Sequence, residues 1–504
     1  MRLIYFDIDT LRADHLGCYG YRRRTSPNID ALATEGVRFD NVYASDTPCL
    51  PSRSALISGQ LGIRNGAVNH GGARADPYPE ADRGFQSALA LHSWTRVMRE
   101  AGMWTASFST FAERHSAYHF DAGFNECFNL GTRGLETADQ VALVAGEWLA
   151  RNAWRPSWFL HVHLWDPHTP YRTPASFADD VVDGPAPAWL DEEVRAAHWA
   201  LPGPHSAQEM SGFGPRSVWD PWPRQPQQAS DMDQVRRMFD GYDVGVRYAD
   251  HWVGQLLGQL DELGLYDETA VLVSSDHGET LGELGVYCDH QTADQQVARL
   301  PCVLRWPGRA PAGAQDTSLH YQIDVAATVL ELLGARVPDR WDGASFADSM
   351  GAAEPRGRDH LVLSHAAWTA QRAVRFDDTI MIRTYHDGFH GYPDLMLFDL
   401  AEDPHEQHDL APSRPGEVAF ALGLLSEWEA DARYRSPSGA DPLWSVLAEG
   451  GPWHARGHFD RYMKHLRATG RGDWAQRFEE ARATAGEGTP APSGALSRSP
   501  VASG

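Results

Sequence analysis

Three stretches of this chain carry residues that could do chemistry together: one cysteine and two groups of potential metal ligands. Cys49 lies in the segment Thr47–Arg53, which reads Cys-x-Pro-Ser-Arg from the cysteine onward. A bare Cys-x-x-x-Arg spacing also fits a phosphatase-type loop, or a small buried cysteine at a proline-bounded helix start. The potential ligands are Asp9 and the pair Asp276 and His277. Carboxylates are hard oxygen ligands for divalent cations, and an imidazole makes such a site softer.

Both carboxylates follow apolar runs that predict buried strands. The run Leu3–Ile8 precedes Asp9, and the run Thr269–Ser275 precedes Asp276. The carboxyl ends of neighbouring parallel strands meet at one edge of a sheet, where open α/β folds place their sites. We therefore expect the two groups to lie close together despite their separation in sequence.

Strand and helix patterns alternate over residues 1–370 and predict a mostly parallel sheet covered on both faces. A long helix over 231–263 is expected to cover the sheet, with Asp243, Arg247 and Asp250 on a solvated face. The other predicted elements are helices over 94–100 and 140–151 and strands over 105–109, 158–164, 300–306 and 360–364.

Three other parts of the chain have a different texture. Residues 171–230 are rich in proline and tryptophan and predict an irregular insert, either a wall against a sugar or aryl leaving group or ordinary surface packing. Residues 371–483 predict a small antiparallel α+β subdomain, and the Gly-, Ala-, Pro- and Ser-rich tail 484–504 predicts disorder. The subdomain strands are expected over 373–376, 379–384 and 395–400.

Composition limits the partners and the compartment. A net charge of −24 argues against a nucleic-acid or anionic-membrane surface, so positive potential for an anionic substrate must be local to the pocket. Five cysteines without C-x-x-C pairing favour a reducing compartment. The chain opens directly on a strand-like run, with no secretory-signal pattern and no apolar run of membrane-spanning length. We expect a cytoplasmic protein that binds neither nucleic acid nor membrane.

Taken together, the motifs resemble those of the sulfatase family over nearly the whole chain up to residue 412. The resemblance implies an alkaline-phosphatase-like α/β sandwich with a smaller C-terminal subdomain. It also implies that a maturation enzyme oxidises Cys49 to formylglycine and that a divalent cation, usually Ca²⁺ in this family, is bound. The matching segments are Ile8–Gly17 and Ser275–Glu279 for the metal, the cysteine motif, and the landmarks Arg305–Gly308, Leu397–Leu400 and Glu402–Pro404.

The family mechanism implies roles for particular residues. One hydroxyl of the formylglycine hydrate attacks sulfur and displaces the alcohol, and the second expels sulfate and restores the aldehyde, which divides one displacement into two easier ones. Arg53 would hold the formylglycine hydroxyl. His168 would help to hold the sulfate or protonate the leaving oxygen, because histidine titrates near neutral pH. The implied metal ligands are Asp9, Asp276, His277 and the modified Cys49.

The metal motifs depart from the commoner family pattern. Thr10 stands where a second acid is usual, and His277 where asparagine is usual. Asp7 lies on the same strand face as Asp9 and could compensate for the missing acid. An imidazole ligand lets Mn²⁺ or another transition ion compete with Ca²⁺.

The residues expected to contact the substrate also depart from that pattern. His290 stands where a lysine is expected, and Arg114 or His115 would replace a Lys-x-His pair. His70, beside two glycines, is either a pocket donor or a plain turn residue. Because these residues contact the transferred group, their replacement leaves both a sulfate group and a phosphorus-based group possible.

We therefore predict a sulfatase that hydrolyses a small anionic substrate, a sulfated sugar or an aryl sulfate. The enzymatic alternative is a phosphonate monoester or phosphodiester hydrolase of the same superfamily, which similarly carries Asp-His at the second metal motif. The alternative from another class is a catalytically silent binding protein in which Cys49 stays a thiol.

Overall fold

The main sheet of the computed structural model is mostly parallel, as predicted. The model describes residues 1–78, 89, 92–177, 184–352, 354–436 and 438–485. In this described part the main sheet has eight strands in the order β11-β2-β10-β7-β1-β6-β4-β5. Only β10 runs against its neighbours. The strands are β1 (Arg2–Ile8), β2 (Val37–Tyr43), β4 (Trp104–Phe108), β5 (Glu126–Phe128), β6 (Trp158–Leu164), β7 (Thr269–Ser274), β10 (Arg299–Arg305) and β11 (Ala314–Tyr321).

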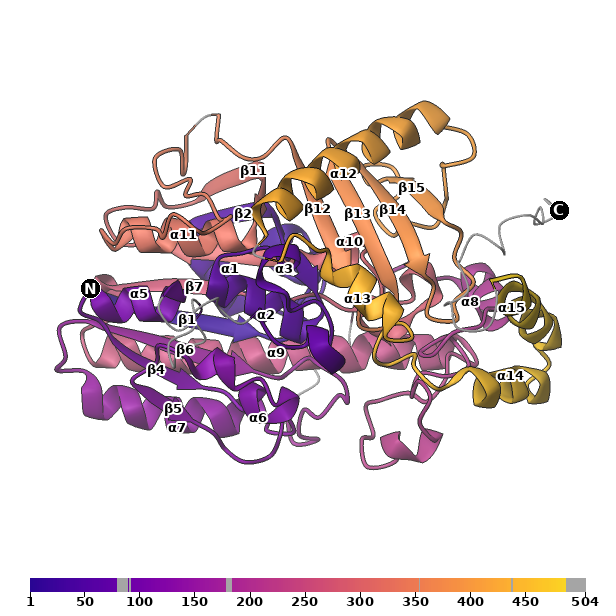
Figure 1. The fold of residues 1–504 in the computed structure, drawn as a ribbon. Coiled ribbons are helices and arrows are strands. Elements are labelled where there is room, and N and C mark those ends of the chain that lie inside the picture. Colours follow the sequence, from indigo (N-terminus) through magenta and orange to yellow (C-terminus); the bar gives the residue numbers. More distant parts are fainter. Residues whose placement is uncertain (79–88, 90–91, 178–183, 353, 437, 486–504) are drawn as a thin grey trace.

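Helices cover both faces of this sheet (Figure 1). Successive residues of a strand point to opposite faces, so Ile4 and Phe6 enter one apolar cluster while Leu3 and Tyr5 enter the other. The first cluster is completed by α1 (Pro27–Glu35), α7 (Ala138–Asn152) and α9 (Met232–Glu262), and the second by α2 (Cys49–Ser58), α5 (Trp94–Glu100) and α11 (Gln322–Leu332).

A smaller sheet lies beside the main one (Figure 1) and has the order β15-β14-β13-β12-β3. Its members are antiparallel except for β12 and β3, and α12 (Pro415–Arg435) packs on one face. This sheet takes in β12, which the sequence analysis placed with the first part of the chain, and β3, a two-residue strand that it did not predict. The strands are β3 (Asp46–Thr47), β12 (His360–His365), β13 (Ala370–Phe376), β14 (Thr379–His386) and β15 (Leu395–Asp399).

The remaining elements are short. The insert 171–230 contains the helix α8 (Glu192–Trp199). The helix α15 (Gly472–Ala485) includes the first two residues of the tail 484–504, which was predicted to be disordered. Residues 486–504 lie outside the described residues. The others are α3 (Gly62–Asn65), α6 (Phe111–His115), α10 (Gln295–Ala298), α13 (Pro442–Ala448), α14 (Phe459–Ala468), α15 (Gly472–Ala485) and the hairpin β8 (Thr280–Leu281) with β9 (Tyr287–Asp289). Among the helices in the described ranges, none combines the length and apolar character that a membrane span requires.

The prediction that Asp243, Arg247 and Asp250 lie on a solvated face of α9 is wrong for the two aspartates. Asp243 and Asp250 are fully buried. Asp243 accepts hydrogen bonds from Tyr21 at 2.7 Å and Arg23 at 2.8 Å, and Asp250 accepts from the backbone N–H of Ile29 at 2.9 Å. A buried carboxylate is stabilised by such partners, which come from distant segments and leave no periodic signal on the helix itself.

Glu209 of the insert joins the insert to the C-terminal helices. Its carboxylate accepts hydrogen bonds from Tyr462 at 3.0 Å and His465 at 2.7 Å, and it is paired with Arg471. Burial raises its pKa, but His465 and Arg471 outweigh that effect and lower it below its usual range. The ionised form therefore stabilises this contact.

Replacing Glu209 by glutamine is expected to destabilise the α14–α15 region by about 2–4 kcal/mol, because buried Arg471 loses its counter-charge. Hydrogen exchange of residues 459–485 should rise in the variant and stay unchanged in the exposed control Glu193→Gln. A lowered carboxyl pKa stabilises the fold above the unfolded value of 4.5 and loses that effect as the pH falls. Variant and wild type should thus converge in acid, and equal exchange at neutral pH would contradict this assignment.

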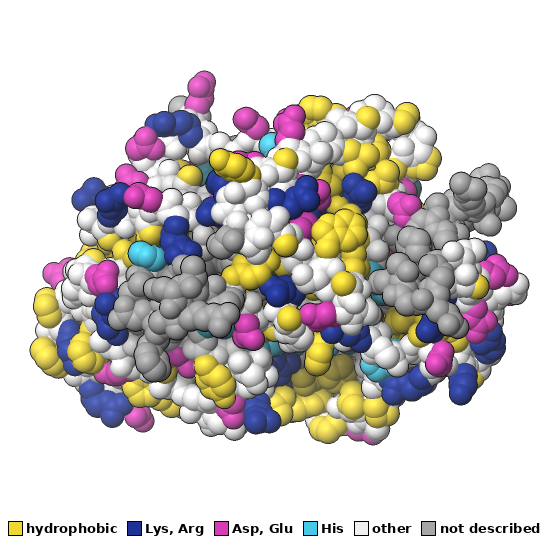
Figure 2. Space-filling model, viewed as in Figure 1, with side chains coloured by type: hydrophobic (Ala, Val, Ile, Leu, Met, Phe, Trp, Pro, Cys, Tyr) yellow, Lys and Arg dark blue, Asp and Glu magenta, His cyan; other side chains and the backbone are white. Residues whose placement is uncertain are grey.

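The charged surface is mixed in sign. On the face drawn in Figure 2, basic and acidic side chains lie interspersed with hydrophobic ones. With a net charge of −24, attraction of an anion depends on charges inside a pocket.

Candidate active site

The two predicted ligand groups meet at adjacent strand ends. β1 and β7 are neighbours, with Asp7 paired to Ser274 in register, so the residues that follow each strand leave the sheet side by side. The possible ligand atoms of four buried residues all lie within 4.8 Å of one another; these residues are Asp9, Cys49, Asp276 and His277. The juxtaposition expected from the strand ends is therefore present in the fold.

Cys49 is the first residue of α2, a helix whose ten residues are all buried. Its Sγ lies 3.0 Å from Nε2 of His277 and 4.0 Å from Nε2 of His290. Burial and the neighbouring Asp9 raise the pKa of the Cys49 thiol to about 11. Reactive cysteines have lowered pKa values, so this side chain as a thiol is not an activated nucleophile.

Arg53 lies one helical turn after Cys49 and is 1% exposed. Its guanidinium donates to Oδ2 of Asp7 and to Oδ2 of Asp9, each at 3.1 Å, and also contacts Asp276. Burial raises the pKa of Asp7, but Arg53 and His161 outweigh this and bring it to about 2. For Asp276, burial and the nearby Asp9 prevail and raise the pKa well above its usual range.

This charge balance fits a divalent cation. Three buried carboxylates face one guanidinium, so two negative charges are unbalanced when all three ionise. Within the described part of the chain, Oδ1 of Asp7 and Oδ1 of Asp9 are buried without a hydrogen-bond partner. Carboxylate oxygens beside an imidazole suit Ca²⁺ and Mn²⁺ alike. Asp7 is outside the four-residue donor group, and Thr10 contributes its backbone N–H to Asp276 at 3.4 Å.

Two histidines of β6 complete the surroundings of Arg53, and the sequence analysis did not assign them to the site. Nε2 of His163 lies 2.8 Å from Arg53, and its Nδ1 lies 2.8 Å from the hydroxyl of Ser109. The same Nε2 lies 3.2 Å from Oδ2 of Asp9, so His163 bridges the guanidinium and this carboxylate. His161 lies 3.2 Å from Asp7. Their alternate spacing in the strand predicted over 158–164 was a usable signal.

His168 and His290 also lie close to Cys49. The three residues form a second group whose possible ligand atoms all lie within 4.8 Å. Burial lowers the pKa of His290, but Asp289 and Glu279 outweigh this and raise it well above its usual range; Oε1 of Glu279 lies 3.2 Å from Nδ1. Burial lowers the pKa of His168 well below its usual range. The pair therefore combines a cationic and a neutral imidazole.

The three predicted substrate contacts are arranged unevenly. The rings of His70 and His115 are 5.0 Å apart, whereas Arg114 is exposed, lies over the ring of Trp165 and donates to the carbonyl of Arg133 at 3.2 Å. The only lysine of the chain is Lys464, in α14. The side chains at the three predicted substrate contacts are therefore histidine and arginine, not lysine.

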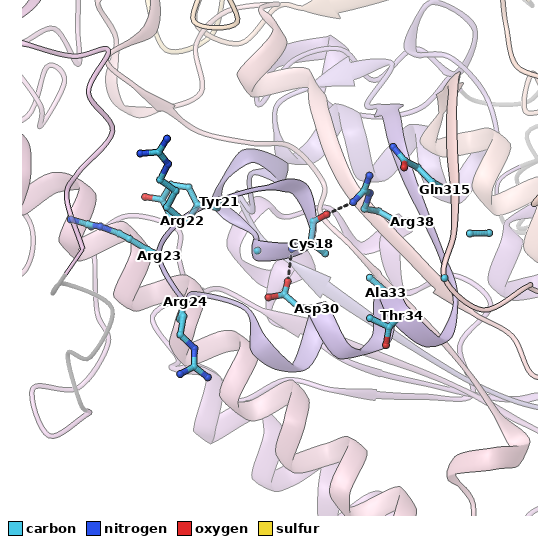
Figure 3. Close-up of a pocket in the computed structure, with 13 residues that line it drawn as sticks. Cys18, Tyr21, Arg22, Arg23, Arg24, Asp30, Ala33, Thr34, Arg38 and Gln315 are labelled. Carbon is cyan, nitrogen blue, oxygen red and sulfur yellow. Dashed lines mark hydrogen bonds between the residues drawn. The ribbon is translucent and has the colours of Figure 1, made fainter.

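A separate cavity of about 560 Å³ lies beside α1 and is rich in arginine (Figure 3). Arg22 and Arg24 extend in opposite directions, and Arg38 is directed at the backbone carbonyl of Cys18. The backbone N–H of Cys18 in turn donates to Asp30 at 2.7 Å. The guanidinium groups do not converge, so this cavity is not built for an anion.

Two family models match most of the chain. The sulfatase model matches residues 3–335, and the model for the C-terminal part of N-sulphoglucosamine sulphohydrolase matches residues 282–418. The chain belongs to the sulfatase family. Accordingly, it is an enzyme of the sulfuric ester hydrolase class with the alkaline-phosphatase-like fold.

Individual relatives are distant but cover most of the chain. An N-acetylglucosamine-6-O-sulfatase of Bacteroides thetaiotaomicron is 22% identical over 89% of each chain. A solved structure of a protein in complex with its substrate D-glucosamine-2-N,6-O-disulfate superposes with a TM-score of 0.68 at 20% identity, covering 86% of this chain and 99% of the other. The phosphonate monoester hydrolase of Agrobacterium radiobacter superposes with a TM-score of 0.62, also at 20% identity, covering 90% and 99%.

Proposed function

We propose that the chain hydrolyses a sulfate ester through a formylglycine formed from Cys49, with one divalent cation held by Asp9, Asp276, His277 and the modified residue. The observation that carries this proposal is the unbalanced charge around Arg53, which lies beside Cys49 at the start of a buried helix. Sγ of Cys49 marks the place of the formylglycine oxygens. The cation would neutralise charge on the ester oxygens and orient the sulfur for attack.

The side chains around Cys49 have separate tasks in this proposal. The formylglycine hydrate supplies the nucleophilic hydroxyl, and Arg53 holds its negative charge. His163, whose Nε2 lies 2.8 Å from Arg53 and 3.2 Å from Asp9, helps to keep the guanidinium in place. His290, 4.0 Å from Sγ, stands where the family lysine would and hydrogen-bonds the ester oxygens. His168 faces the same position and holds the sulfate or serves the leaving oxygen.

The substrate and surroundings follow from the same reasoning. The ester is a small anion, because the positive charge of the site is buried rather than spread over the surface. A formylglycine-generating enzyme is the required partner. All five cysteines are free, which supports a cytoplasmic location. Ca²⁺ is the expected ion, and His277 leaves room for Mn²⁺.

The second candidate is phosphonate monoester or phosphodiester hydrolysis. The motif Asp276-His277 favours it. The fold does not separate the two activities, since both classes of neighbour share it.

Matched esters of 4-nitrophenol separate the two activities. We expect kcat/KM for the sulfate monoester to exceed that for the phosphonate monoester and the phosphodiester by about a hundredfold, because the pocket is matched to one transferred group. The protein must be produced together with a formylglycine-generating enzyme. If kcat/KM for the phosphorus esters equals or exceeds that for the sulfate ester, the protein is a phosphonate monoester or phosphodiester hydrolase instead.

A further inference from the structure

A histidine from the C-terminal part of the chain reaches His70, one of the predicted substrate contacts. His454 lies in the loop between α13 and α14, and its Nε2 is 3.0 Å from Nδ1 of His70. Its backbone N–H donates to the carbonyl of Ala367 at 3.0 Å, and its ring stacks on Trp368 with centroids 4.6 Å apart. This contact joins the loop after α3, the loop after β12 and the C-terminal segment.

Two glycines make this approach possible. A Cβ on Gly71 would lie 2.3 Å from the ring of Trp453, and one on Gly72 would lie 2.5 Å from Oε2 of Glu449. Gly72 also has φ +73°, a conformation that favours glycine. The sequence Asn69-His70-Gly71-Gly72 is therefore shaped to receive the C-terminal loop, which a plain turn does not require.

The contact continues to the proposed catalytic residues. The guanidinium of Arg53 lies over the ring of Phe111 at 4.6 Å, that ring contacts His115 at 4.6 Å, and His115 contacts His70 at 5.0 Å. The charges of Arg53 and Asp9 act on His115, and the charge of His290 acts on both His70 and His454. The imidazoles of His70, His115 and His454 thus lie within electrostatic reach of the proposed catalytic residues.

These imidazoles are neutral and two have free polar atoms. Burial lowers the pKa of His70 and of His115 well below the usual range, and that of His454 to about 4. In the described part of the chain, Nε2 of His70 and Nε2 of His115 are buried without a partner. The proton between His70 and His454 can be on either ring, so Nε2 of His70 can donate or accept.

We propose that His70 and His454, with Trp368 behind them, form the subsite for the alcohol half of the ester, and that this half is a hydroxyl-bearing sugar ring. This rests on the proposed function. A hydroxyl both donates and accepts, which matches the pair, while the stacked Trp368 ring keeps His454 in position. An aryl or steroid group would leave the buried nitrogens unpaired, and a cationic alcohol would find neutral rings.

His454→Ala tests this subsite. With a panel of monosaccharide sulfates, we expect kcat/KM for the best substrate to fall by about 10- to 100-fold, chiefly through KM, since the contact exists before and during reaction. With 4-nitrophenyl sulfate the change should stay below about threefold. The glutamine of His454→Gln can still form a hydrogen bond to His70. Its kcat/KM for the sugar sulfate should therefore lie between the values of wild type and His454→Ala. His408→Ala, at a side chain 82% exposed, is the control and should match wild type.

The outcomes separate the two proposals. A wild-type enzyme that cleaves neither 4-nitrophenyl sulfate nor any sugar sulfate contradicts the proposed function itself. An enzyme that cleaves 4-nitrophenyl sulfate more efficiently than every sugar sulfate overturns only the sugar assignment. If His454→Ala lowers kcat/KM equally for both substrates at an unchanged melting temperature, His454 does not recognise the alcohol half of the ester.

Discussion

Cys49→Ala is expected to lower kcat/KM for 4-nitrophenyl sulfate by about 10⁴-fold or more, because removal of a nucleophile leaves only binding and electrostatic stabilisation. The side chain removed is small, so the fold should persist, with a melting temperature within a few degrees of wild type. Steady-state kinetics and circular dichroism on the same preparation measure both effects.

The matched control is Cys127→Ala, at an exposed cysteine in β5. It should retain activity within about twofold, as surface substitutions usually do. Mass spectrometry of the tryptic peptide Phe39–Arg53, which contains only Cys49 among the cysteines, should show the thiol replaced by an aldehyde or its hydrate. An intact thiol in fully active enzyme would contradict the formylglycine assignment, and an intact thiol in inactive protein would favour the silent binding protein.

Asp276→Asn is expected to remove both bound metal and activity, with kcat/KM lower by about 10³-fold or more, since charge neutralisation on the ester is lost. The variant keeps the shape of the side chain but leaves one fewer negative charge around Arg53. Metal content by elemental analysis should fall from about one ion per chain. This readout does not depend on the identity of the substrate.

The metal-free proteins should behave differently from the metal-loaded ones. Without metal, Asp276→Asn should melt no lower than wild type, because it relieves repulsion from Asp7 and Asp9. Adding Ca²⁺ or Mn²⁺ should raise the melting temperature of wild type by mass action and leave that of Asp276→Asn almost unchanged. The control Asp267→Asn, at a side chain 97% exposed, should respond to metal like wild type. A full metal response in Asp276→Asn would rule out Asp276 as a ligand.

The sequence analysis located the strand ends correctly, and the structure brings its four predicted metal ligands together. An apolar run followed by an acid is a local sequence signal. Because adjacent parallel strands end at the same edge of the sheet, the two acids that follow them, Asp9 and Asp276, lie close together. The Cys-x-Pro-Ser-Arg spacing is local as well, since one helical turn places Arg53 beside Cys49. The errors came at polar residues on helices: Asp243 and Asp250 look like surface residues until their partners from other segments are known.

The sequence by itself determined the family, the mostly parallel sheet and the residues able to hold a metal beside Cys49. The tertiary structure alone decided which charges surround Arg53, because the neighbours of β1 depend on strand order rather than on local pattern. It also placed His163 against Arg53 and His454 against His70, contacts between segments up to several hundred residues apart. Residue types and hydrophobic periodicity can be recognised in short segments of sequence. Which distant segments pair with one another follows only from the packing of the whole chain.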